Sequence, residues 1–340
     1  MMSRAQSDQV PGVELADPAL ADALEDGLAQ VEELLHREVR SEFEFPTETS
    51  LHLVDAGGKR FRPLFTLLAA QFGLARGAGR VQDVVRAAAV VELVHLATLY
   101  HDDVMDEATM RRGAVSANAR WDNTVAILTG DFLFAHASRL VADLGPDAVR
   151  IIARTFAKLV TGQMRETLGP ASGADPVEHY LAVVTEKTGS LIATAGRYGA
   201  MYSGAPTEQI DALRRFGGAI GIAFQISDDI IDIATPATES GKTPGTDLRE
   251  GVRTLPMLYA LAESGPEVDR LRELLAAPLT DDALVTEALI LLRASPGLPR
   301  AVQSLRSYTD AARTELAILP ATPARDALAS LTDYLEARTT

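Results

Sequence analysis

The sequence contains no cysteine among its 340 residues, and it contains only one tryptophan. The absence of cysteine excludes disulfide bonds, thiolate catalysis and zinc–thiolate sites, and it is compatible with a reducing cytoplasm. Basic residues are also scarce relative to acidic ones, 32 against 47, which gives a formal net charge of −15. Because a surface that binds nucleic acid carries an excess of positive charge, this balance argues against a nucleic-acid partner.

Hydrophobic runs that could serve as targeting or membrane segments are few. The N-terminus has no apolar run of the kind found in signal peptides, so we expect a cytoplasmic protein. Residues 217–234 are nearly apolar but contain three aspartates, and each of these would cost about 2.5–3.5 kcal/mol at the centre of a bilayer. We therefore expect a buried core helix with one solvent-exposed end at this place, and no transmembrane segment.

Alternation of polar and apolar residues, the pattern of strands, persists nowhere for more than a few positions. The chain instead carries apolar residues at helical spacing, separated by glycine and proline, which predicts an all-α fold with mostly short connections. We expect residues 1–17 to be mobile and residues 18–340 to form a single domain. The predicted helices span residues 18–40, 62–72, 81–105, 121–144, 147–168, 177–202, 207–233, 255–262, 267–276, 281–294, 298–316 and 323–338.

Two segments share the pattern Asp-Asp-x-x-Asp. The first contains Asp102, Asp103 and Asp106, and the second contains Asp228, Asp229 and Asp232. On a helix, the first and last aspartates of each motif lie one turn apart on one face, where like charges destabilise the helix. A bridging Mg²⁺ ion with diphosphate oxygens in its octahedron is the usual reason to tolerate them. A lone motif of this kind is more often a solvated face, but both motifs follow strongly apolar helix, which favours metal binding.

Cations and hydroxyls occur near these motifs along the chain. Each group would be weak evidence alone, but together with six carboxylates the groups predict a diphosphate site. Nucleotide sites fail on spacing: a P-loop ending in Gly241–Thr243 would need a glycine where Pro236 stands, and no Gly-x-Gly-x-x-Gly occurs. The cations are Lys59, Arg60 and Arg62 beside a predicted helix start, Arg111 and Arg112 after the first motif, and Lys187 and Lys242, each followed by threonine.

Five segments, in this order, resemble the trans-type polyprenyl diphosphate synthases: GGKRFRP, ELVHLATLYHDDVMDEATMRRG, EKTGSL, FQISDDIID and GKTPGTDLREGVRTLP. The resemblance runs from about residue 51 to residue 260. It implies a single all-α domain of the isoprenoid-synthase type with a deep central cavity, assembled as a homodimer. It also implies that an allylic diphosphate, bound with three Mg²⁺ ions between the acidic motifs, ionises and is attacked by isopentenyl diphosphate. The product is five carbons longer, and the cycle repeats.

The resemblance also assigns roles residue by residue. The predicted metal ligands are Asp102, Asp106, Asp228 and Asp232, with Asp103 and Asp229 as supporting members of the catalytic set. The predicted contacts to isopentenyl diphosphate are Lys59, Arg62, His95 and Arg112. The groups around the allylic diphosphate are Arg111, Lys187, Thr188, Gln225 and Lys242, and all of these except Gln225 also belong to the predicted catalytic set. One departure is that Val252 follows Gly251 where many members have lysine, so Arg253 receives no role.

A stripe of small side chains leads away from the first motif and predicts the product length. It extends over about 22 Å at 1.5 Å per residue, and it lacks the bulky aromatic that short-chain members of the family carry four or five positions before the first aspartate. We predict a product longer than C20, a C30–C50 quinone side chain. The stripe consists of Ala87, Val90, Val94, Ala97 and Thr98, whereas Tyr100 points to the opposite face. Alternatively, these residues only let helices pack closely and Phe132, Phe134 or Met164 forms the floor.

Other functions compete with this interpretation. A short-chain farnesyl or geranylgeranyl diphosphate synthase is the alternative within the family. A class I terpene cyclase would share the first motif, but its second metal site typically contains Asn or Asp with Ser or Thr and Glu at set spacing. A regulatory subunit of a heteromeric synthase would be expected to lose the acidic motifs or their basic partners, and this chain keeps both. The expected partners are the two diphosphates, a second copy of the chain and, transiently at product release, a membrane.

Overall fold

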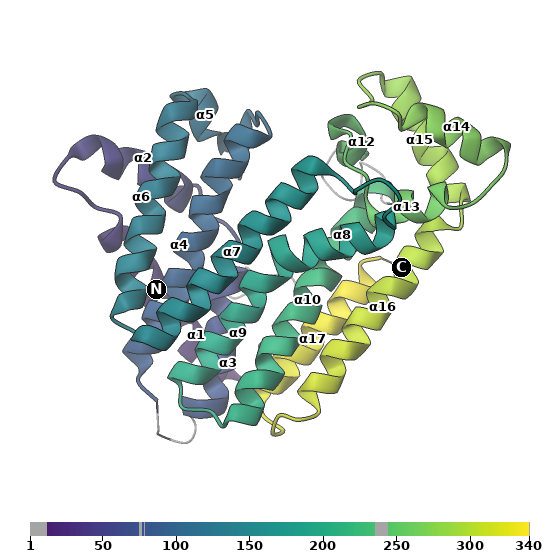
Figure 1. Cartoon of the computed structure of the whole chain (residues 1–340). Coiled ribbons are helices and arrows are strands. Elements are labelled where there is room, and N and C mark those ends of the chain that lie inside the picture. The colour runs from purple at the N-terminus through teal and green to yellow at the C-terminus, as the bar shows by residue number, and fades with distance from the viewer. Residues whose placement is uncertain (1–11, 75–76, 78, 235–243, 340) are drawn as a thin grey trace. The chain divides into compact units, whose positions relative to one another are not determined.

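The computed structural model describes residues 12–74, 77, 79–234 and 244–339 (Figure 1). The chain divides into two compact units. Unit 1 contains Met1–Ala157, Leu191–Gly217 and Glu315–Ala329, and unit 2 contains Lys158–Ser190, Gly218–Thr314 and Ser330–Thr340. The prediction of a single domain stays a prediction, and residues 1–11 of the predicted mobile segment lie outside the described residues.

Helices make up nearly all of the regular structure, which confirms the predicted all-α class. They begin where the sequence provides caps: the Asp17 side chain accepts a hydrogen bond of 2.8 Å from the backbone N–H of Leu20, and Pro18 occupies the first helical position. The helices assigned mainly to unit 1 are α1 (Pro18–Glu38), α2 (Glu44–Asp55), α3 (Phe61–Leu74), α4 (Val81–Met105), α5 (Ala117–Arg120), α6 (Asn123–Ala142) and α9 (Ser190–Tyr202).

The helices of unit 2 lie later in the chain, and four long helices contribute residues to both units. Those of unit 2 are α8 (Pro176–Val184), η1 (Thr185–Gly189), α12 (Thr246–Glu250), α13 (Leu255–Leu261), α14 (Pro266–Leu274) and α15 (Asp282–Ala294). The shared helices are α7 (Pro146–Leu168), α10 (Thr207–Ala234), α16 (Gly297–Leu316) and α17 (Pro323–Ala337). The described strands are β1 (Met110–Arg111) and β2 (Ala114–Val115), which form one short antiparallel hairpin in unit 1.

Helix α4 is the central element of unit 1. It packs against α1, α3 and α6, and its apolar residues from Val84 to Ala97 are almost completely buried. A helix that is apolar on all sides is stable in water only when neighbours surround it. The first acidic motif therefore lies at the end of a helix whose position is fixed along most of its length.

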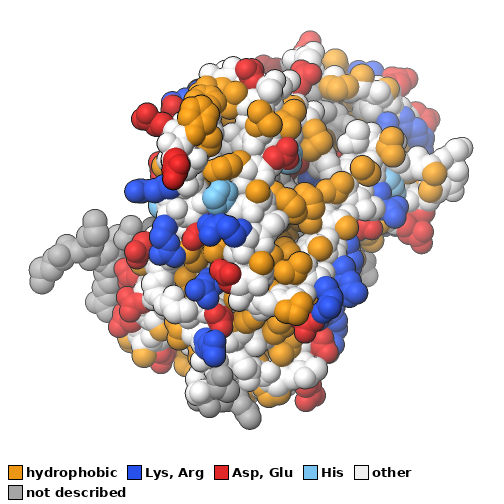
Figure 2. Space-filling view, turned by 60° about the vertical axis from the view of Figure 1, so that its left-hand side comes forward, with side chains coloured by type: hydrophobic (Ala, Val, Ile, Leu, Met, Phe, Trp, Pro, Cys, Tyr) orange, Lys and Arg blue, Asp and Glu red, His pale blue; other side chains and the backbone are white. Residues whose placement is uncertain are grey.

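Among the described residues, two helices, α4 and α6, are long and apolar enough to cross a membrane, judged by length and composition alone. Helix α4 is 72% buried over its most apolar window, as the core helix of a soluble protein is, whereas α6 is 39% buried. Ile127 and Leu128 of α6 are large exposed apolar residues of unit 1. Figure 2, which turns the side with α2, α5 and α6 forward, shows hydrophobic side chains gathered between charged ones.

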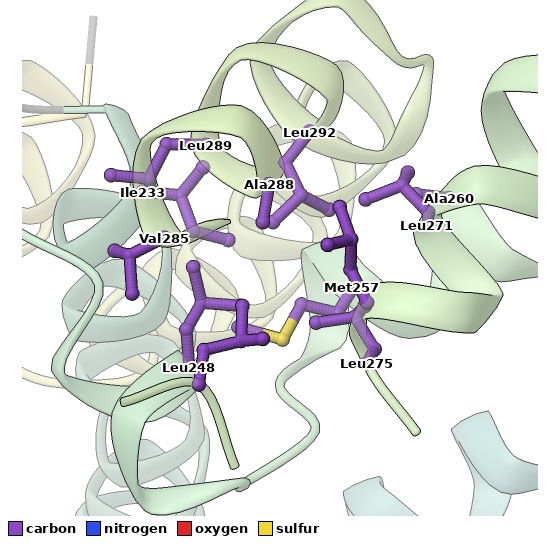
Figure 3. Close-up of a cluster of buried hydrophobic side chains, with 12 residues drawn as sticks. Ile233, Leu248, Met257, Ala260, Leu271, Leu275, Val285, Ala288, Leu289 and Leu292 are labelled. Atoms are coloured by element: carbon purple, nitrogen blue, oxygen red, sulfur yellow. The ribbon is translucent and has the colours of Figure 1, made fainter. Parts of the chain in front are cut away.

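Unit 2 has its own hydrophobic core, which Figure 3 shows in close-up. It joins the end of α10 to α12, α13, α14 and α15, and this packing fixes the short helix α12 beside the end of α10. The members are Ile233, Leu248, Met257, Ala260, Leu271, Leu274, Leu275, Leu279, Val285, Ala288, Leu289 and Leu292.

Candidate active site

The first acidic motif occupies the C-terminal end of α4 in unit 1. Asp102 is half-buried, Asp103 is buried, and Asp106 is exposed and caps the helix. Because the C-terminal end of a helix carries partial negative charge, three carboxylates there are unfavourable unless cations offset them. The local structure therefore favours a cation at this helix end, and the metal-binding role of the motif stays a prediction.

Asp103 forms an ion pair with Arg111 of the hairpin. Arg111 Nε donates to Asp103 Oδ1 at 2.6 Å. Burial raises the pKa of Asp103 above its ordinary value, and Arg111 opposes this rise. The second carboxylate oxygen of Asp103 is also buried, with no hydrogen-bond partner among the described residues. The structure thus gives Asp103 the task of anchoring Arg111 to the end of α4.

The turn of the hairpin places Arg112. The turn consists of Arg112 and Gly113, whose φ angles are 53° and 77°. Positive φ at both residues is what a two-residue turn needs to match the twist of the hairpin strands. The Arg112 guanidinium donates to the carbonyl of Leu53 at 3.2 Å and to that of Gly57. A Cβ at Gly58, whose φ is 134°, would lie 2.8 Å from Arg112 Cζ, so this position requires glycine.

A buried carboxylate holds two arginines together behind this turn. Glu92, on α4, is 1% exposed. It accepts a hydrogen bond from Arg60 Nη1 at 3.0 Å and lies 3.7 Å from Arg112 Nη2. Arg60 also pairs with Glu32 of α1. The sequence interpretation gave Glu32 and Glu92 no role, although a glutamate inside the apolar run 84–97 was a signal that a cation lies nearby.

Arg62 and His95 lie in the same cationic environment. Burial lowers the pKa of Arg62 to about 10, and nearby Arg112 acts in the same direction. Burial and the surrounding arginines lower the pKa of His95 well below its ordinary value, so His95 is neutral at pH 7. The Arg62 Nε is buried with no partner among the described residues. Lys59 is exposed. A group of donors that combines half-buried Arg62 and His95 with exposed Lys59 is suited to an anion with several oxygens.

The three carboxylates of the second motif, near the end of α10 in unit 2, each have a different partner. Arg338 Nη2 donates to Asp228 Oδ1 at 2.9 Å. The Asp232 carboxylate accepts from the backbone N–H groups of Thr246 and Asp247, at 3.0 and 3.2 Å, at the start of α12. The remaining member, Asp229, is 2% exposed and points into the protein.

Asp229 is held by a network of neutral donors. The Tyr180 hydroxyl of α8 donates to its Oδ2, and Gln225 Nε2 donates to its Oδ1 at 3.0 Å. The backbone of Leu255 supplies a further hydrogen bond. Burial raises the pKa of Asp229 to about 7 despite these donors. Gln225, predicted to lie beside the allylic diphosphate, is thus engaged with Asp229 here.

A fourth carboxylate belongs to this cluster and was missed from the sequence. Burial, together with the charges of Asp232 and Asp229, raises the pKa of Asp247 to about 8. Arg338, which pairs with Asp228, was also missed. Both residues lie far from the motif in sequence, so spacing within the motif contained no signal for either one.

Lys187 and Thr188 lie in η1, a single π-helical turn between α8 and α9. Such turns are rare and often mark functional sites. Lys187 pairs with Glu166 of α7, and a Cβ at Gly162 of α7 would lie 2.7 Å from the backbone nitrogen of Lys187. Lys242, predicted for the same diphosphate, lies outside the described residues.

The residues that depart from the family pattern lie between α12 and α13. Val252 is 42% exposed, and Arg253 Nη2 donates to the carbonyl of Leu275 at 3.2 Å. Arg253 therefore has a hydrogen bond to a backbone oxygen within unit 2.

The proposed wall stripe on α4 is buried. Ala87, Val90, Val94 and Ala97 are at most 1% exposed, and Thr98 is half-buried with its hydroxyl donating to the carbonyl of His95. On the other side of the helix, the Tyr100 hydroxyl donates to the carbonyl of Thr49 in α2. The role of the stripe in chain length stays a prediction. Of the alternative floor residues, Phe134 stacks on Phe156, Phe132 packs on His136, and Met164 is 60% exposed.

The donor set fits a hard divalent cation. Every predicted ligand is a carboxylate, the group that Mg²⁺ and Ca²⁺ prefer, and each motif presents a pair of carboxylates one turn apart. In the part of the chain that the structure describes, no group of three or more His, Asp or Glu lies close enough to hold a metal ion by itself. Oxygens of the substrate can fill the remaining coordination positions of the metal, because Mg²⁺ sites that act on phosphates use few protein ligands.

Several known proteins are similar to this chain over most of its length. A family model described as polyprenyl synthetase matches residues 45–292. A nonaprenyl diphosphate synthase from Mycobacterium tuberculosis is 60% identical over 335 residues, 98% of this chain and 99% of that protein. A dimethylallyltranstransferase from the same organism is 50% identical over 325 residues, 96% of this chain and 98% of that protein.

A solved structure is similar along nearly the whole chain. It is a geranylgeranyl pyrophosphate synthase from Corynebacterium glutamicum, complexed with calcium and isoprenyl diphosphate. The TM-score is 0.87 at 53% sequence identity, and the match covers 96% of this chain and 99% of that chain.

Proposed function

The chain belongs to the polyprenyl synthetase family, and from this membership we propose that it is a Mg²⁺-dependent prenyltransferase. It condenses isopentenyl diphosphate head-to-tail (1′-4) with an allylic diphosphate, and it repeats this step to make an all-trans polyprenyl diphosphate. The observation that supports this most strongly is the group of half-buried cations at Arg62 and Arg112, next to neutral His95 and the first acidic motif.

The residues of unit 1 bind isopentenyl diphosphate in this proposal. Arg62 and Arg112 provide charge-assisted hydrogen bonds to its phosphate oxygens. His95 provides a neutral donor, and exposed Lys59 provides a positive point charge. Glu92 and the carbonyls of Leu53 and Gly57 hold Arg112 in place, so little side-chain entropy is lost when the anion binds. Arg62, His95 and Arg112 are half-buried, and this partial burial strengthens their electrostatic contacts relative to water.

The allylic diphosphate is bound with Mg²⁺ ligated by Asp102, Asp106, Asp228 and Asp232, and calcium in the C. glutamicum complex is consistent with a divalent cation. Bound Mg²⁺ supplies positive charge that stabilises the departing pyrophosphate. Arg111, fixed by Asp103, and Lys187, fixed by Glu166, add positive charge on the protein side. Thr188 and Gln225 contribute neutral contacts, and Lys242 a further cation.

The product is longer than C20, in the range C30–C50, and serves as a quinone side-chain precursor. Two observations support this length: the small side chains of the α4 stripe, and the similarity to a nonaprenyl diphosphate synthase over almost the whole chain. A short-chain product is the second candidate, because the dimethylallyltranstransferase is also 50% identical.

Purified protein incubated with isopentenyl diphosphate, Mg²⁺ and each of the C5, C10, C15 and C20 allylic diphosphates tests the proposal. We expect elongation beyond C20, read by chromatography of the dephosphorylated products, and loss of activity with EDTA. Products that stop at C15 or C20 would support the short-chain candidate. Hydrocarbon released from an allylic diphosphate alone would indicate a cyclase, and activity only with a second protein would indicate a subunit of a heteromeric synthase.

We further propose that the chain acts in the cytoplasm as a homodimer and contacts a membrane transiently when the product is released. The exposed apolar side chains of α6, in a chain of net charge −15, support burial of this helix against a second copy. A polyprenyl product is too apolar to leave into water, which supports membrane contact at release.

A further inference from the structure

The Tyr180 hydroxyl is the donor in the hydrogen bond to Asp229 described above. Tyr180 is half-buried on α8. Burial and the nearby charge of Asp229 raise the pKa of Tyr180 well above its ordinary value. The phenol therefore keeps its proton throughout the range in which proteins work and serves only as a donor towards this carboxylate.

Asp229 accepts hydrogen bonds from three donors, two of which lie on other elements. Its carboxylate takes hydrogen bonds from Tyr180 of α8, from Gln225 one turn earlier on α10, and from the backbone of Leu255 in α13. Helix α8 itself packs against α13. The two bonds to α8 and α13 fix the rotation of the last turns of α10 about the helix axis.

That rotation determines where the other two aspartates point. At 100° per residue, Asp228 and Asp232 lie within about 40° of one another around α10, and both lie about 60–100° to the same side of Asp229. Holding Asp229 inward therefore aims Asp228 and Asp232 together in one other direction. A rotation of this turn would move both predicted ligands at once.

We propose that Tyr180 is a positioning residue, which holds Asp229 so that Asp228 and Asp232 present their oxygens to a Mg²⁺-bound diphosphate. This inference rests on the proposed function. A hydroxyl suits the task because it satisfies a buried carboxylate without adding a positive charge that would repel the metal. Asp103 in the first motif, by contrast, is held by the cation Arg111.

Tyr180→Phe tests the proposal because it removes the donor and keeps the ring. Isothermal titration of the protein with inorganic pyrophosphate in the presence of Mg²⁺ measures ligand binding without turnover. We expect the affinity for pyrophosphate to fall by about tenfold, consistent with loss of one preorganising hydrogen bond to a charged group. In turnover, the KM of the allylic diphosphate and the Mg²⁺ concentration for half activity should rise by about five- to tenfold.

The kinetic constants also separate positioning from general loosening. The predicted contacts to isopentenyl diphosphate belong to unit 1, so the KM of isopentenyl diphosphate should stay within about twofold of wild type. If both KM values rise together and the unfolding temperature drops, Tyr180 has only a structural role, and the proposal is wrong.

Tyr259→Phe is the matched control. Tyr259 is also half-buried in unit 2, and its hydroxyl makes one side-chain hydrogen bond, 2.9 Å long, to Ser304 Oγ. This variant should bind pyrophosphate as wild type does. If Tyr180→Phe and Tyr259→Phe bind pyrophosphate with the same affinity, the proposal is wrong.

Asp229→Asn gives a second route that does not depend on Tyr180→Phe folding well. It keeps the side-chain volume but disturbs the same network, so it should weaken pyrophosphate binding by itself. The double variant, which combines Tyr180→Phe with Asp229→Asn, should bind pyrophosphate no more weakly than the worse of the two single variants. If the two losses of affinity add up in the double variant, the residues do not act through a shared mechanism. If wild type binds pyrophosphate but elongates nothing, the proposed function fails while the titrations still decide the role of Tyr180.

Discussion

At the scale of single residues, Glu92 is the carboxylate on which the cationic group of unit 1 depends. Glu92→Gln removes the charge that offsets Arg60 and Arg112 and keeps the shape of the side chain. We expect the free energy of unfolding to fall by about 2–4 kcal/mol, because breaking a buried ion pair leaves buried charge uncompensated. Urea unfolding measures this loss. The KM of isopentenyl diphosphate should rise as well, since Arg112 loses its support.

An exposed ion pair provides the control for this change. Glu48 pairs with Arg120 at 3.1 Å, and about half of each side chain is exposed. Glu48→Gln should therefore change the free energy of unfolding by less than about 0.5 kcal/mol. If Glu92→Gln costs no more than Glu48→Gln, the buried carboxylate does not support the arginines.

Asp247 links stability to pH in the protein freed of divalent cations. Its pKa is raised from 3.8 to about 8 by burial and neighbouring carboxylates. Between these values the folded state binds more protons than the unfolded state, so stability falls as pH rises. Asp247→Asn removes this penalty. It should raise the free energy of unfolding by about 1–3 kcal/mol at pH 8.5 and leave it nearly unchanged at pH 4.

Thermal or urea unfolding in EDTA at the two pH values measures this difference. Asp269→Asn is the control, because Asp269 is exposed and pairs with Arg272 one turn away. A gain at pH 8.5 that persists at pH 4 would show that the effect of Asp247→Asn does not come from its charge.

The chemically informative residues could be found from sequence where they form a local pattern. Two carboxylates one turn apart reveal a cation site without knowledge of the fold, because the helix fixes their distance. The partners of those carboxylates could not be found this way. Tyr180 and Arg338 reach the second motif from 49 and 110 residues away, so only the packing of α8 and α17 brings them there.

At the scale of elements, long amphipathic or apolar helices were predictable, and short ones were not. The bounds of α4 agree with the predicted 81–105, because Gly77 and Gly79 precede it and the acidic motif ends it. The short helices α2, of 12 residues, and α12, of five, were missed, since so few turns carry too little periodicity. The predicted helix 177–202 contains the π-helical turn η1, which no spacing in the sequence revealed.

The stripe on α4 allows a direct test of chain length. Ala97→Phe places a ring five residues before Asp102, and we expect shorter products from the same starter. Ala88→Phe is the control, because Ala88 lies about 180° around the helix from Ala97 and is equally buried. It should disturb packing to a similar extent, about 1–3 kcal/mol, without shortening the product.

Chromatography of the products decides between the two uses of the stripe. If Ala97→Phe destabilises the protein too much to assay, Ala97→Leu is the milder variant. Products of unchanged length from a folded Ala97 variant would mean that the small residues serve helix packing, and that another element sets the length.

At the scale of the whole molecule, the sequence carries strong net negative charge, yet α6 exposes apolar side chains. Leu128 is 61% exposed and Ile127 is 43% exposed. A patch of this kind on a protein surface marks a partner or a membrane. A second copy is the expected partner, because most soluble oligomers are homo-oligomers and a two-fold axis buries the same face on both copies.

Leu128→Asp tests this expectation, because it places one charge on each copy within the interface that we propose. Sedimentation should show a dimer for wild type and a shift towards monomer for the variant, by about tenfold or more in dissociation constant, as for loss of a central interface residue. Ile290→Asp is the control, since Ile290 is 60% exposed on α15 of unit 2. If wild type sediments as a monomer and floats with lipid vesicles through Leu128, the apolar face of α6 binds a membrane and not a second copy.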